Sequence, residues 1–338
     1  MLSRFLRIRR LPSIVASFPR VKSNSSSPFS IVPIGQLQPT QQSPYEPGQL
    51  ILHRFFGYRG VVLHSWKANL YEMTGFTPKI HPLDESSEET DSPFKTPVKR
   101  EKPVYVYAVL FDVRDATLSG FSMIVGVPFL PYGEGRVENT YSATDMDYAF
   151  HEDLLPYTCT NELPLINSSF MEFMHFDPDA EPKVYPTDRL EQVLKKFGPL
   201  LEVQSVHQGT TDGIRVTAIP FFLGRRKWRF LILIEDTTHR GIKLCGVYWN
   251  FSTADGRPLN EFDAEFVETP LLPAQSPYFQ FHGCFQVPTP NVRACGFFRL
   301  EDTDGIALAV DIPLLPFLDV GYYRELYQSE TGSNDEIE

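Results

Sequence analysis

Residues 48–66 read GQLILHRFFGYRGVVLHSW, and this stretch decides the expected fold. Two runs rich in β-branched, leucine and aromatic residues flank GYRG, which is the pattern of a strand, a tight turn and a second strand. Gly57 and Gly60 offer the turn residues that adopt a positive φ without strain. The sequence therefore predicts a β-hairpin, and the structured part of the chain is expected to begin at Gly48.

The rest of the chain extends this β pattern. Residues 103–115, PVYVYAVLFDVRD, are rich in β-branched and aromatic residues and predict another strand. Further apolar segments follow in the second half at short intervals, with hairpin turns indicated at Asp255-Gly256 and Asp304-Gly305. Short strands joined by tight turns are typical of an antiparallel β-sandwich of immunoglobulin-like build. We therefore expect an all-β protein.

One segment, TDRLEQVLKKFG at residues 187–198, predicts a helix. Its apolar residues recur at helical spacing, and they are Leu190, Val193, Leu194 and Phe197. Thr187 is a suitable N-cap, and Gly198 followed by Pro199 indicates the helix end. Because the helix lies between two strand-rich regions, we place the domain boundary there and expect the helix to join the domains.

The predicted organisation of the chain follows from these patterns. It comprises a mitochondrial transit peptide (1–27), a disordered linker (28–47), a first β domain (48–185) with a charged insertion (77–102), a linker helix (186–200), a second β domain (201–320) and an acidic tail (321–338). The linker is rich in Ser, Pro and Gln. A length of 338 residues exceeds what one hydrophobic core usually supports, which favours two domains.

The first residues carry the pattern of an organellar targeting signal. The segment MLSRFLRIRRLPSIVASFPR is rich in arginine, contains serine, has no acid and is amphipathic at its start. We therefore expect import into the mitochondrial matrix, with a nuclear or cytosolic pool as an open alternative. The sequence has no apolar run long enough to span a membrane, so no membrane contact is expected.

The charge of the chain bears on nucleic-acid binding. The formal net charge is −11, and residues 1–45 contain basic residues but no acid, so the body of the chain is more acidic still. Binding to a phosphate backbone scales with the number of phosphates neutralised, to which an acidic body is poorly suited. Direct nucleic-acid binding is therefore not expected, and a DNA-binding module of the mitochondrial nucleoid stays as an alternative.

The sequence indicates neither a catalytic nor a metal centre. The cysteines are Cys159, Cys245, Cys284 and Cys295. They form no C-x-x-C pair and have no zinc-like histidine spacing, so we expect free thiols. The histidines weighed as a general base are His64, His151, His239 and His282. They are scattered, and residues 133–135, GEG, lack the third glycine of a dinucleotide turn. We expect no catalytic residue, metal or cofactor, and an enzyme of unknown chemistry is an unfavoured alternative.

Two sets of residues are candidate protein-binding sites. Gln49, Leu52, Phe55 and Phe56 have the Q-x-x-L-x-x-F-F spacing of sliding-clamp-binding peptides. That mode needs an exposed, locally helical peptide, whereas these residues fall in the first predicted strand, so scaffold is the favoured interpretation.

Trp66 and Tyr71 form the second set of candidates, because aromatic anchors supply much of the binding energy at protein interfaces. Both residues lie just before the charged insertion. A buried structural tryptophan is the favoured alternative for Trp66.

The quoted segments also resemble a known family. GQLILHRFFGYRGVVLHSW and HEDLLPYT resemble a YccV/HspQ-like domain, and IRVTAIPFFLG, WRFLILIED and FRLEDTDGIALAVDIPLLPF resemble an ApaG domain. In this order, over about residues 48–318, the chain resembles the polymerase delta-interacting protein 2 family. The resemblance implies an SH3-like small β-barrel followed by a fibronectin-like β-sandwich. It also implies a non-enzymatic adaptor whose partners include DNA polymerase subunits, the sliding clamp and matrix protease machinery. We expect the chain to be a monomer.

The resemblance has one departure that concerns ligand binding. ApaG domains often carry a G-x-G-x-x-G turn interpreted as a phosphate site, but the matching stretch here is EFDAEFVETPLL at residues 261–272. Asp263, Glu265 and Glu268 stand where glycine backbone amides would approach a phosphate, and carboxylates repel one. We therefore do not expect nucleotide binding. A bacterial relative of the first domain is described as recognising hemimethylated DNA, which keeps the DNA-binding alternative open.

Overall fold

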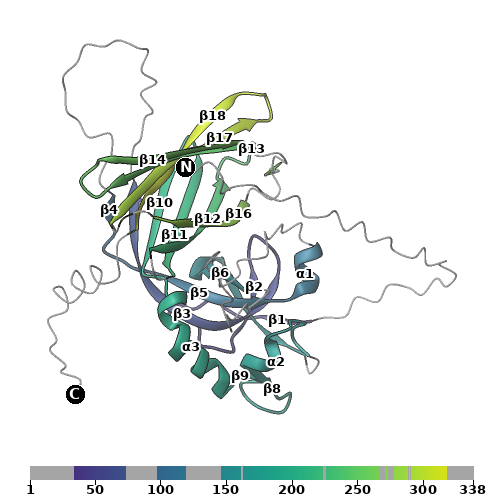
Figure 1. Ribbon diagram of the computed structural model, residues 1–338. Helices are drawn as coiled ribbons and strands as arrows, with labels where there is room; N and C mark the ends of the chain where they lie inside the picture. The colour runs from purple at the N-terminus through teal and green to yellow at the C-terminus, as the bar shows by residue number, and fades with distance from the viewer. Residues whose placement is uncertain are drawn as a thin grey trace, which may run out of the picture. The chain divides into compact units, whose positions relative to one another are not determined.

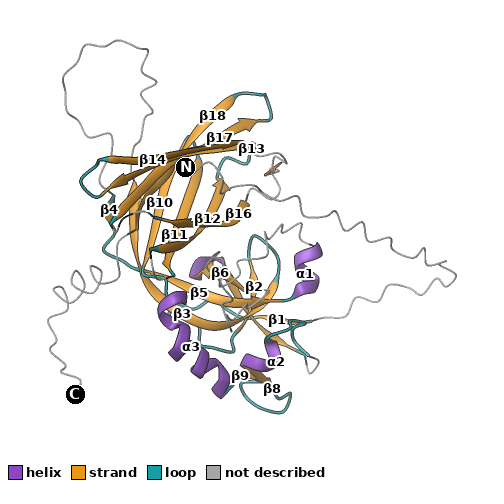
Figure 2. Cartoon of the chain, in the orientation of Figure 1, coloured by secondary structure: helices purple, strands orange, loops and turns teal. Residues whose placement is uncertain are grey.

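A computed structural model shows an all-β protein, as predicted. It describes residues 34–73, 97–118, 146–160, 163–223, 226–265, 271–272, 278–287, 289 and 291–317. Strands dominate these residues and helices are few (Figure 2). Several predictions lie outside the described residues: the transit peptide (1–27), residues 77–96 of the charged insertion, GEG (133–135), Glu268, the side chains of His282 and Cys284, and the acidic tail (321–338).

The first half of the chain forms a curled antiparallel sheet. Its strands are β1 (Gly35–Leu37), β2 (Leu50–His53), β3 (Arg59–Met73), β5 (Val104–Phe111), β6 (Met146–Phe150) and β7 (Leu154–Cys159). Pairing runs β1-β7-β2-β3-β5-β6, and η1 (His151–Asp153) turns the chain directly from β6 into β7. The short strand β4 (Val98–Lys99) pairs with β3, so the end of the predicted charged insertion belongs to the sheet.

The predicted hairpin is present, but its two glycines act differently. β2 pairs with β3 in antiparallel register, and Gly57 in the turn has a φ of +71°. Gly60 has no positive φ, contrary to expectation. A Cβ atom there would lie 2.5 Å from Cγ1 of Val109 and 2.8 Å from the carbonyl oxygen of Leu110. Gly60 is therefore required for close packing of β3 on β5 rather than for turn geometry.

The predicted linker is wrong for residues 34–47. β1 pairs with β7, and Tyr45 is 2% exposed. The ring of Tyr45 stacks on His151 with centroids 4.8 Å apart, and its backbone N–H donates to the Tyr107 hydroxyl at 3.1 Å. The Ser, Pro and Gln composition indicated a linker, whereas one aromatic anchor and a three-residue strand fix this segment to the sheet.

The predicted helix is α3 (Asp188–Leu201), which contacts α2 (Phe170–Phe173) and β9 (Val184–Pro186). The strand β8 (Met174–Phe176) pairs with β9, and a further short helix is α1 (Val113–Leu118). Thr187 caps α3 as expected, since its side chain accepts from the Leu190 N–H. The helix does not end at Gly198-Pro199. The Glu202 N–H donates to the Gly198 carbonyl at 2.8 Å, and Leu201 is buried in the core, so packing holds one further turn.

The second half is a two-sheet sandwich. One layer contains β10 (Ser205–Thr211), β11 (Ile214–Phe222), β12 (Lys227–Asp236) and β16 (Tyr278–Gln286). The other has the order β14 (Pro258–Glu265), β13 (Ile242–Thr253), β17 (Val292–Asp302) and β18 (Ala307–Phe317), with β15 (Leu271–Leu272) beside β13. Both predicted hairpin turns are present, with positive φ at Gly256 and Gly305. A buried apolar cluster fills the space between the layers.

The two halves are joined by a shared sheet, not only by a helix. The last part of β3 pairs in parallel with β10, from Asn69 opposite Ser205 to Met73 opposite Gly209, which makes one eleven-stranded sheet (Figure 1). One apolar cluster includes Val61 and Trp66 of the first half and Ile219 of the second. The described residues therefore form one continuous body, in which the predicted linker helix at 186–200 is not the only connection between the halves.

Candidate functional site

The clamp-like residues are part of the scaffold. None of them lies on a helix: Gln49 precedes β2, Leu52 is in β2, and Phe55 and Phe56 are in the following turn. Phe56 is 8% exposed, and the Gln49 amide donates to the Leu50 carbonyl at 2.9 Å. The half-buried ring of Phe55 stacks on Tyr278 with centroids 4.0 Å apart. The interpretation as a clamp-binding peptide is therefore wrong for this segment.

The two aromatic anchor candidates are also packed. Trp66 is 9% exposed and packs in the core near Tyr148, with ring centroids 5.9 Å apart. Tyr71 is half-buried and stacks on the buried ring of His207, with centroids 5.1 Å apart. Trp66 is therefore buried, as the favoured alternative expected, whereas Tyr71 is only half-buried and its role in binding stays a prediction.

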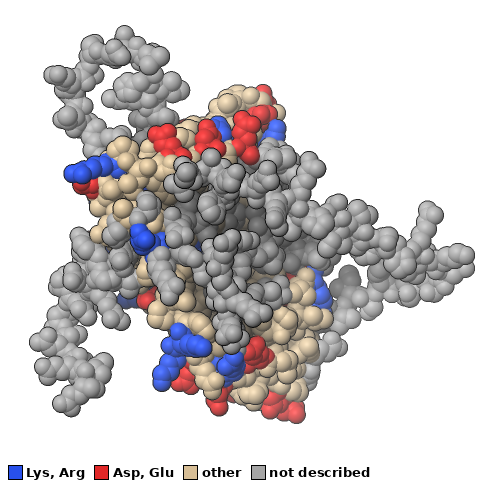
Figure 3. Space-filling view, in the orientation of Figure 1, with Lys and Arg blue, Asp and Glu red and all other residues tan. Residues whose placement is uncertain are grey.

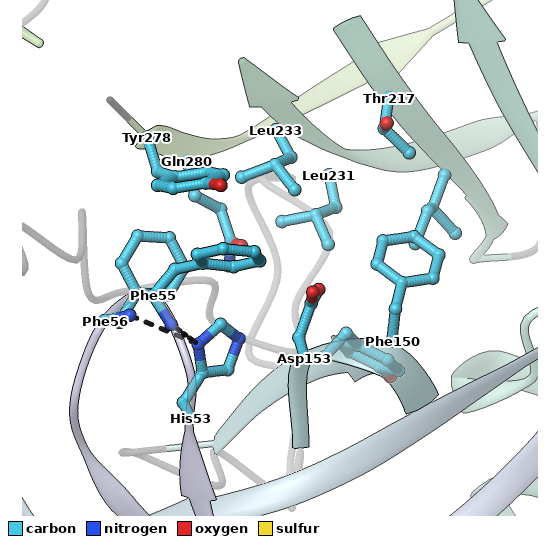
Figure 4. Close-up of a pocket in the computed structure, with 12 residues that line it drawn as sticks. His53, Phe55, Phe56, Phe150, Asp153, Thr217, Leu231, Leu233, Tyr278 and Gln280 are labelled. Atoms are coloured by element: carbon cyan, nitrogen blue, oxygen red, sulfur yellow. Dashed lines mark hydrogen bonds between the residues drawn. The ribbon is translucent and has the colours of Figure 1, made fainter. Parts of the chain in front are cut away.

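A small cavity lies where the two halves meet (Figure 4). From the first half it is lined by His53, Phe55, Phe56, Tyr148, Phe150 and Asp153, and from the second by Thr217, Ile219, Leu231, Leu233, Tyr278 and Gln280. The free space is about 10 Å³, which is room for about one water molecule. This cavity therefore holds no small-molecule substrate.

The titratable side chains of this cavity have shifted pKa values. His53 Nδ1 accepts the N–H groups of Phe55 at 3.3 Å and Phe56 at 3.2 Å, so the ring proton lies on Nε2 (Figure 4). Burial lowers the pKa of His53 to about 3. Burial, followed by the charges of Glu152 and Glu235, raises the pKa of Asp153 to about 7. His53 is therefore a neutral structural residue near neutral pH, and a weak base.

A hydrogen-bonded carboxylate ties the halves together beside the cavity. Asp147 of β6 is fully buried and accepts from the Tyr58 hydroxyl at 2.8 Å and the Tyr148 N–H at 2.8 Å. The Gln280 amide of β16 donates to the same carboxylate at 2.5 Å. Burial raises the pKa of Asp147. These donors satisfy the buried Asp147 carboxylate, which would destabilise the folded chain if it accepted no hydrogen bonds. One of the donors, the Gln280 amide, comes from the other half.

The buried Arg229 makes a second polar contact between the two halves. The Arg229 guanidinium lies over the Phe221 ring at 4.0 Å and over the Tyr148 ring at 5.3 Å, and it donates to the Tyr148 hydroxyl at 3.2 Å. That hydroxyl donates to the Leu201 carbonyl at the end of α3. Sequence reasoning missed Asp147, Arg229 and Gln280, because no local pattern marks residues that meet only in the folded chain.

One serine and histidine pair resembles part of a hydrolase triad. His207 Nε2 lies 3.0 Å from the Ser205 hydroxyl, and both residues are buried. Nδ1 of His207 has no hydrogen-bond partner, and burial lowers its pKa to about 3. A triad needs an acid that orients the base and an accessible nucleophile, and this pair has neither. It is part of the junction between β3 and β10.

The other predicted histidines and cysteines also have structural surroundings. His151 Nδ1 lies 2.8 Å from the Tyr107 hydroxyl, and Nε2 lies 2.7 Å from the Gln41 carbonyl oxygen. His64 packs edge-on against Trp66, and His239 occupies a turn with a positive φ. The described cysteines are free thiols, and they are Cys159, Cys245 and Cys295. Within the described residues, no cluster of His, Cys, Asp and Glu could hold a metal ion.

The surface charges do not form a basic stripe on the face in Figure 3, where lysines and arginines stand among carboxylates. Several arginines are engaged by acids: Arg59 with Asp115, Arg100 with Glu72, Arg215 with Glu235, Arg257 with Asp255 and Arg299 with Asp263. A nucleic-acid site would need such cations to be available for phosphates. No helix in the described part of the chain is long and apolar enough to cross a membrane.

Comparison with known proteins gives relatives over most of the chain. No family model matches it. It is 33% identical over 290 residues to polymerase delta-interacting protein 2 of Mus musculus, covering 81% of this chain and 76% of that protein. It is 27% identical over 131 residues to Protein ApaG of Rhizobium leguminosarum, covering 36% of this chain and 99% of that protein. The ApaA structure from Bordetella pertussis aligns at 19% identity with a TM-score of 0.27, covering 31% of this chain and 90% of that chain.

Proposed function

The chain belongs to the polymerase delta-interacting protein 2 family, and on this premise we propose that it is a non-enzymatic, protein-binding adaptor of the mitochondrial matrix. Membership confirms the resemblance expected from the sequence, including an ApaG domain in part of the chain. The matching relatives are named for an interaction or as ApaG proteins, not for a reaction.

The observation that carries the proposal is the joined body of the two halves. Three kinds of contact hold the halves together: the hydrogen bond from Gln280 to Asp147, the parallel pairing of β3 with β10, and a common apolar core. A joined body presents its surfaces at fixed separations, so a partner on each half would be held in a defined relative position. The cavity between the halves is too small for a substrate, which favours binding over catalysis there.

The partners we propose are proteins of DNA maintenance. The relatives are named for an interaction with polymerase delta, and we take DNA polymerase subunits as one class of partner. The sliding clamp and matrix protease machinery are further classes implied by the resemblance. A clamp contact would have to use a surface other than residues 49–56, because Phe56 is buried there. The engaged arginines on the described surface favour protein partners over DNA.

Cross-linking mass spectrometry on intact mitochondria tests this function. We expect cross-links from surface lysines of the chain, such as Lys67 and Lys195, to polymerase or protease subunits of the matrix. Cross-links that map only within the chain, together with a cytosolic distribution of the full-length protein, would overturn the proposed function. Turnover of a metabolite by the purified protein would overturn its non-enzymatic part.

A further inference from the structure

The sheet of β14, β13, β17 and β18 carries an aromatic pair on its outer face. Tyr248 of β13 stands opposite Phe297 of β17 in the register, and the rings stack with centroids 5.2 Å apart. Neighbouring positions in these strands, Trp249 and Phe298, point inward and are buried. Tyr248 and Phe297 are instead only half-buried, so they form an aromatic surface turned away from the core.

Carboxylates flank this aromatic pair on both sides. Asp263 of β14 is opposite Tyr248, and Asp311 of β18 is opposite Phe297, which gives the row Asp263-Tyr248-Phe297-Asp311 across the sheet. Glu261 is exposed on the same side of β14. Acidic side chains gather over this sheet at the top of Figure 3. The row is therefore an aromatic strip between acidic ends.

The two ends of the row differ in their hydrogen bonding. Asp263 is engaged by the Arg299 guanidinium at 2.6 Å. One carboxylate oxygen of Asp311, Oδ2, is shielded from water and accepts no hydrogen bond. Burial raises the pKa of Asp311, a hydrogen bond with the Thr211 side chain lowers it, and the charge of Asp212 raises it again, to about 6, so most of the carboxyl is ionised at neutral pH. The carboxylate therefore contributes negative charge beside the Phe297 ring, which it faces across the strand pair.

We propose that this outer face docks a basic segment of a partner protein, whose arginine or lysine side chain lies over the Phe297 ring beside the Asp311 carboxylate. The inference rests on the proposed adaptor function and assigns one partner-binding surface to it, the outer face of this sheet. A cation over an aromatic face is attracted by the ring, and an arginine can stack on the ring while it donates to a neighbouring carboxylate. Phosphate-bearing partners are disfavoured, because Glu261 and Asp311 would repel them.

The spacing of the row indicates how such a segment would lie. Neighbouring strands are about 4.8 Å apart, so the row from β14 to β18 spans about 14 Å. An extended peptide advances about 3.3 Å per residue, so alternate side chains that face the sheet cover this span within about five residues. A segment with arginines at three alternate positions therefore covers the row, with its outer arginines near the two aspartates and its middle arginine over the aromatic pair.

Fluorescence anisotropy with a synthetic peptide tests the proposal on the full-length chain. The probe is a fluorescein-labelled peptide with arginine at three alternate positions, and the control probe has glutamine at those positions. Phe297→Leu removes the ring and keeps an apolar side chain, and Asp311→Asn removes the charge and keeps the size. Tyr185→Leu and Asp179→Asn on the first half, where both residues are exposed, are the matched controls.

We expect the arginine peptide to bind and the glutamine peptide not to bind. Each of the Phe297→Leu and Asp311→Asn variants should weaken binding by about fivefold to tenfold, and the controls by less than about twofold. Unchanged thermal unfolding of each variant shows that the sheet is intact, and Tyr248→Leu serves as the second ring variant if Phe297→Leu unfolds. Equal weakening by Asp179→Asn, or no binding of the arginine peptide, overturns this inference. Cross-links to matrix proteins at other surfaces would then leave the adaptor function standing.

Discussion

The side-chain amide of Gln280 donates a hydrogen bond to the Asp147 carboxylate, although 133 positions separate the two residues in the chain. The bond joins β16 of the second half to β6 of the first, and both residues are buried. A donor from one half thus completes the hydrogen bonding of a carboxylate in the other, so the stability of the two halves is coupled.

Replacing Gln280 with leucine should destabilise the whole chain. Asp147 would lose one of its donors in a buried site, at a cost of about 1–2 kcal/mol in the free energy of unfolding. Equilibrium urea unfolding measures this cost, with the exposed Gln36→Leu as a control that should change stability by less than about 0.5 kcal/mol. Equal stability of the two variants would show that the bond does not couple the halves.

Asp153 should make the chain less stable as the pH rises. Its pKa of about 7 in the folded state lies above the ordinary value of 3.8, so the folded state keeps a proton that the unfolded state releases. The stabilisation is complete below about pH 4 and is lost as the pH rises through 7. Asp153→Asn mimics the protonated form, and it should be more stable than the natural chain at pH 8 by on the order of 2 kcal/mol.

The buried side chains of His53 and His207 have the opposite effect from Asp153 on folding stability: they make the chain more stable as the pH rises. The pKa values of His53 and His207 are lowered to about 3, so both side chains favour folding above pH 6.5 and lose this contribution as the pH falls. In the natural chain the effects of Asp153 and the histidines partly cancel. The stability of Asp153→Asn should therefore rise steadily from pH 4 to 7 in urea unfolding. A parallel profile for the two proteins would contradict the raised pKa of Asp153.

Two truncations should separate targeting from folding. A chain beginning at Ile34 keeps β1 and Tyr45, so it should fold with unchanged stability while losing mitochondrial import. A chain beginning at Gly48 also loses the stacking of Tyr45 on His151 and the pairing of β1 with β7, and it should be less stable by about 2–4 kcal/mol. Thermal unfolding and an import assay measure the two effects. Import of the shorter chains would contradict the targeting expectation.

Local patterns in the sequence predicted local structure well. The turn at Gly57, the Thr187 cap and the turn at Asp255-Gly256 each depend on a few neighbouring residues, and each is present. The extent of β3 was not predictable in this way. Its last residues, from Asn69 to Met73, lie just before the charged insertion, and their parallel pairing with β10 brings together segments more than 130 positions apart.

The favoured interpretations, scaffold for Phe56 and a buried Trp66, match the structure, although local patterns alone did not decide them. The spacing of Gln49 to Phe56 and the aromatic side chain of Trp66 are equally compatible with an exposed peptide and with a core, and only the packing of the other half decides between them. The stack of Phe55 on Tyr278 and the contact of Arg229 with Tyr148 depend on a strand order that no local pattern specifies. The sequence alone therefore does not predict which side chains are buried where the two halves meet.

The most direct test of the account is whether the two halves unfold together. Trp66 reports on the first half, and Trp228 and Trp249 report on the second. One variant keeps only Trp66, and another replaces Trp66 with phenylalanine. In each variant, urea unfolding followed by tryptophan fluorescence should have the same midpoint as unfolding followed by far-ultraviolet circular dichroism. A fluorescence midpoint that differs from the dichroism midpoint in either variant would contradict one joined body and the adaptor function built on it.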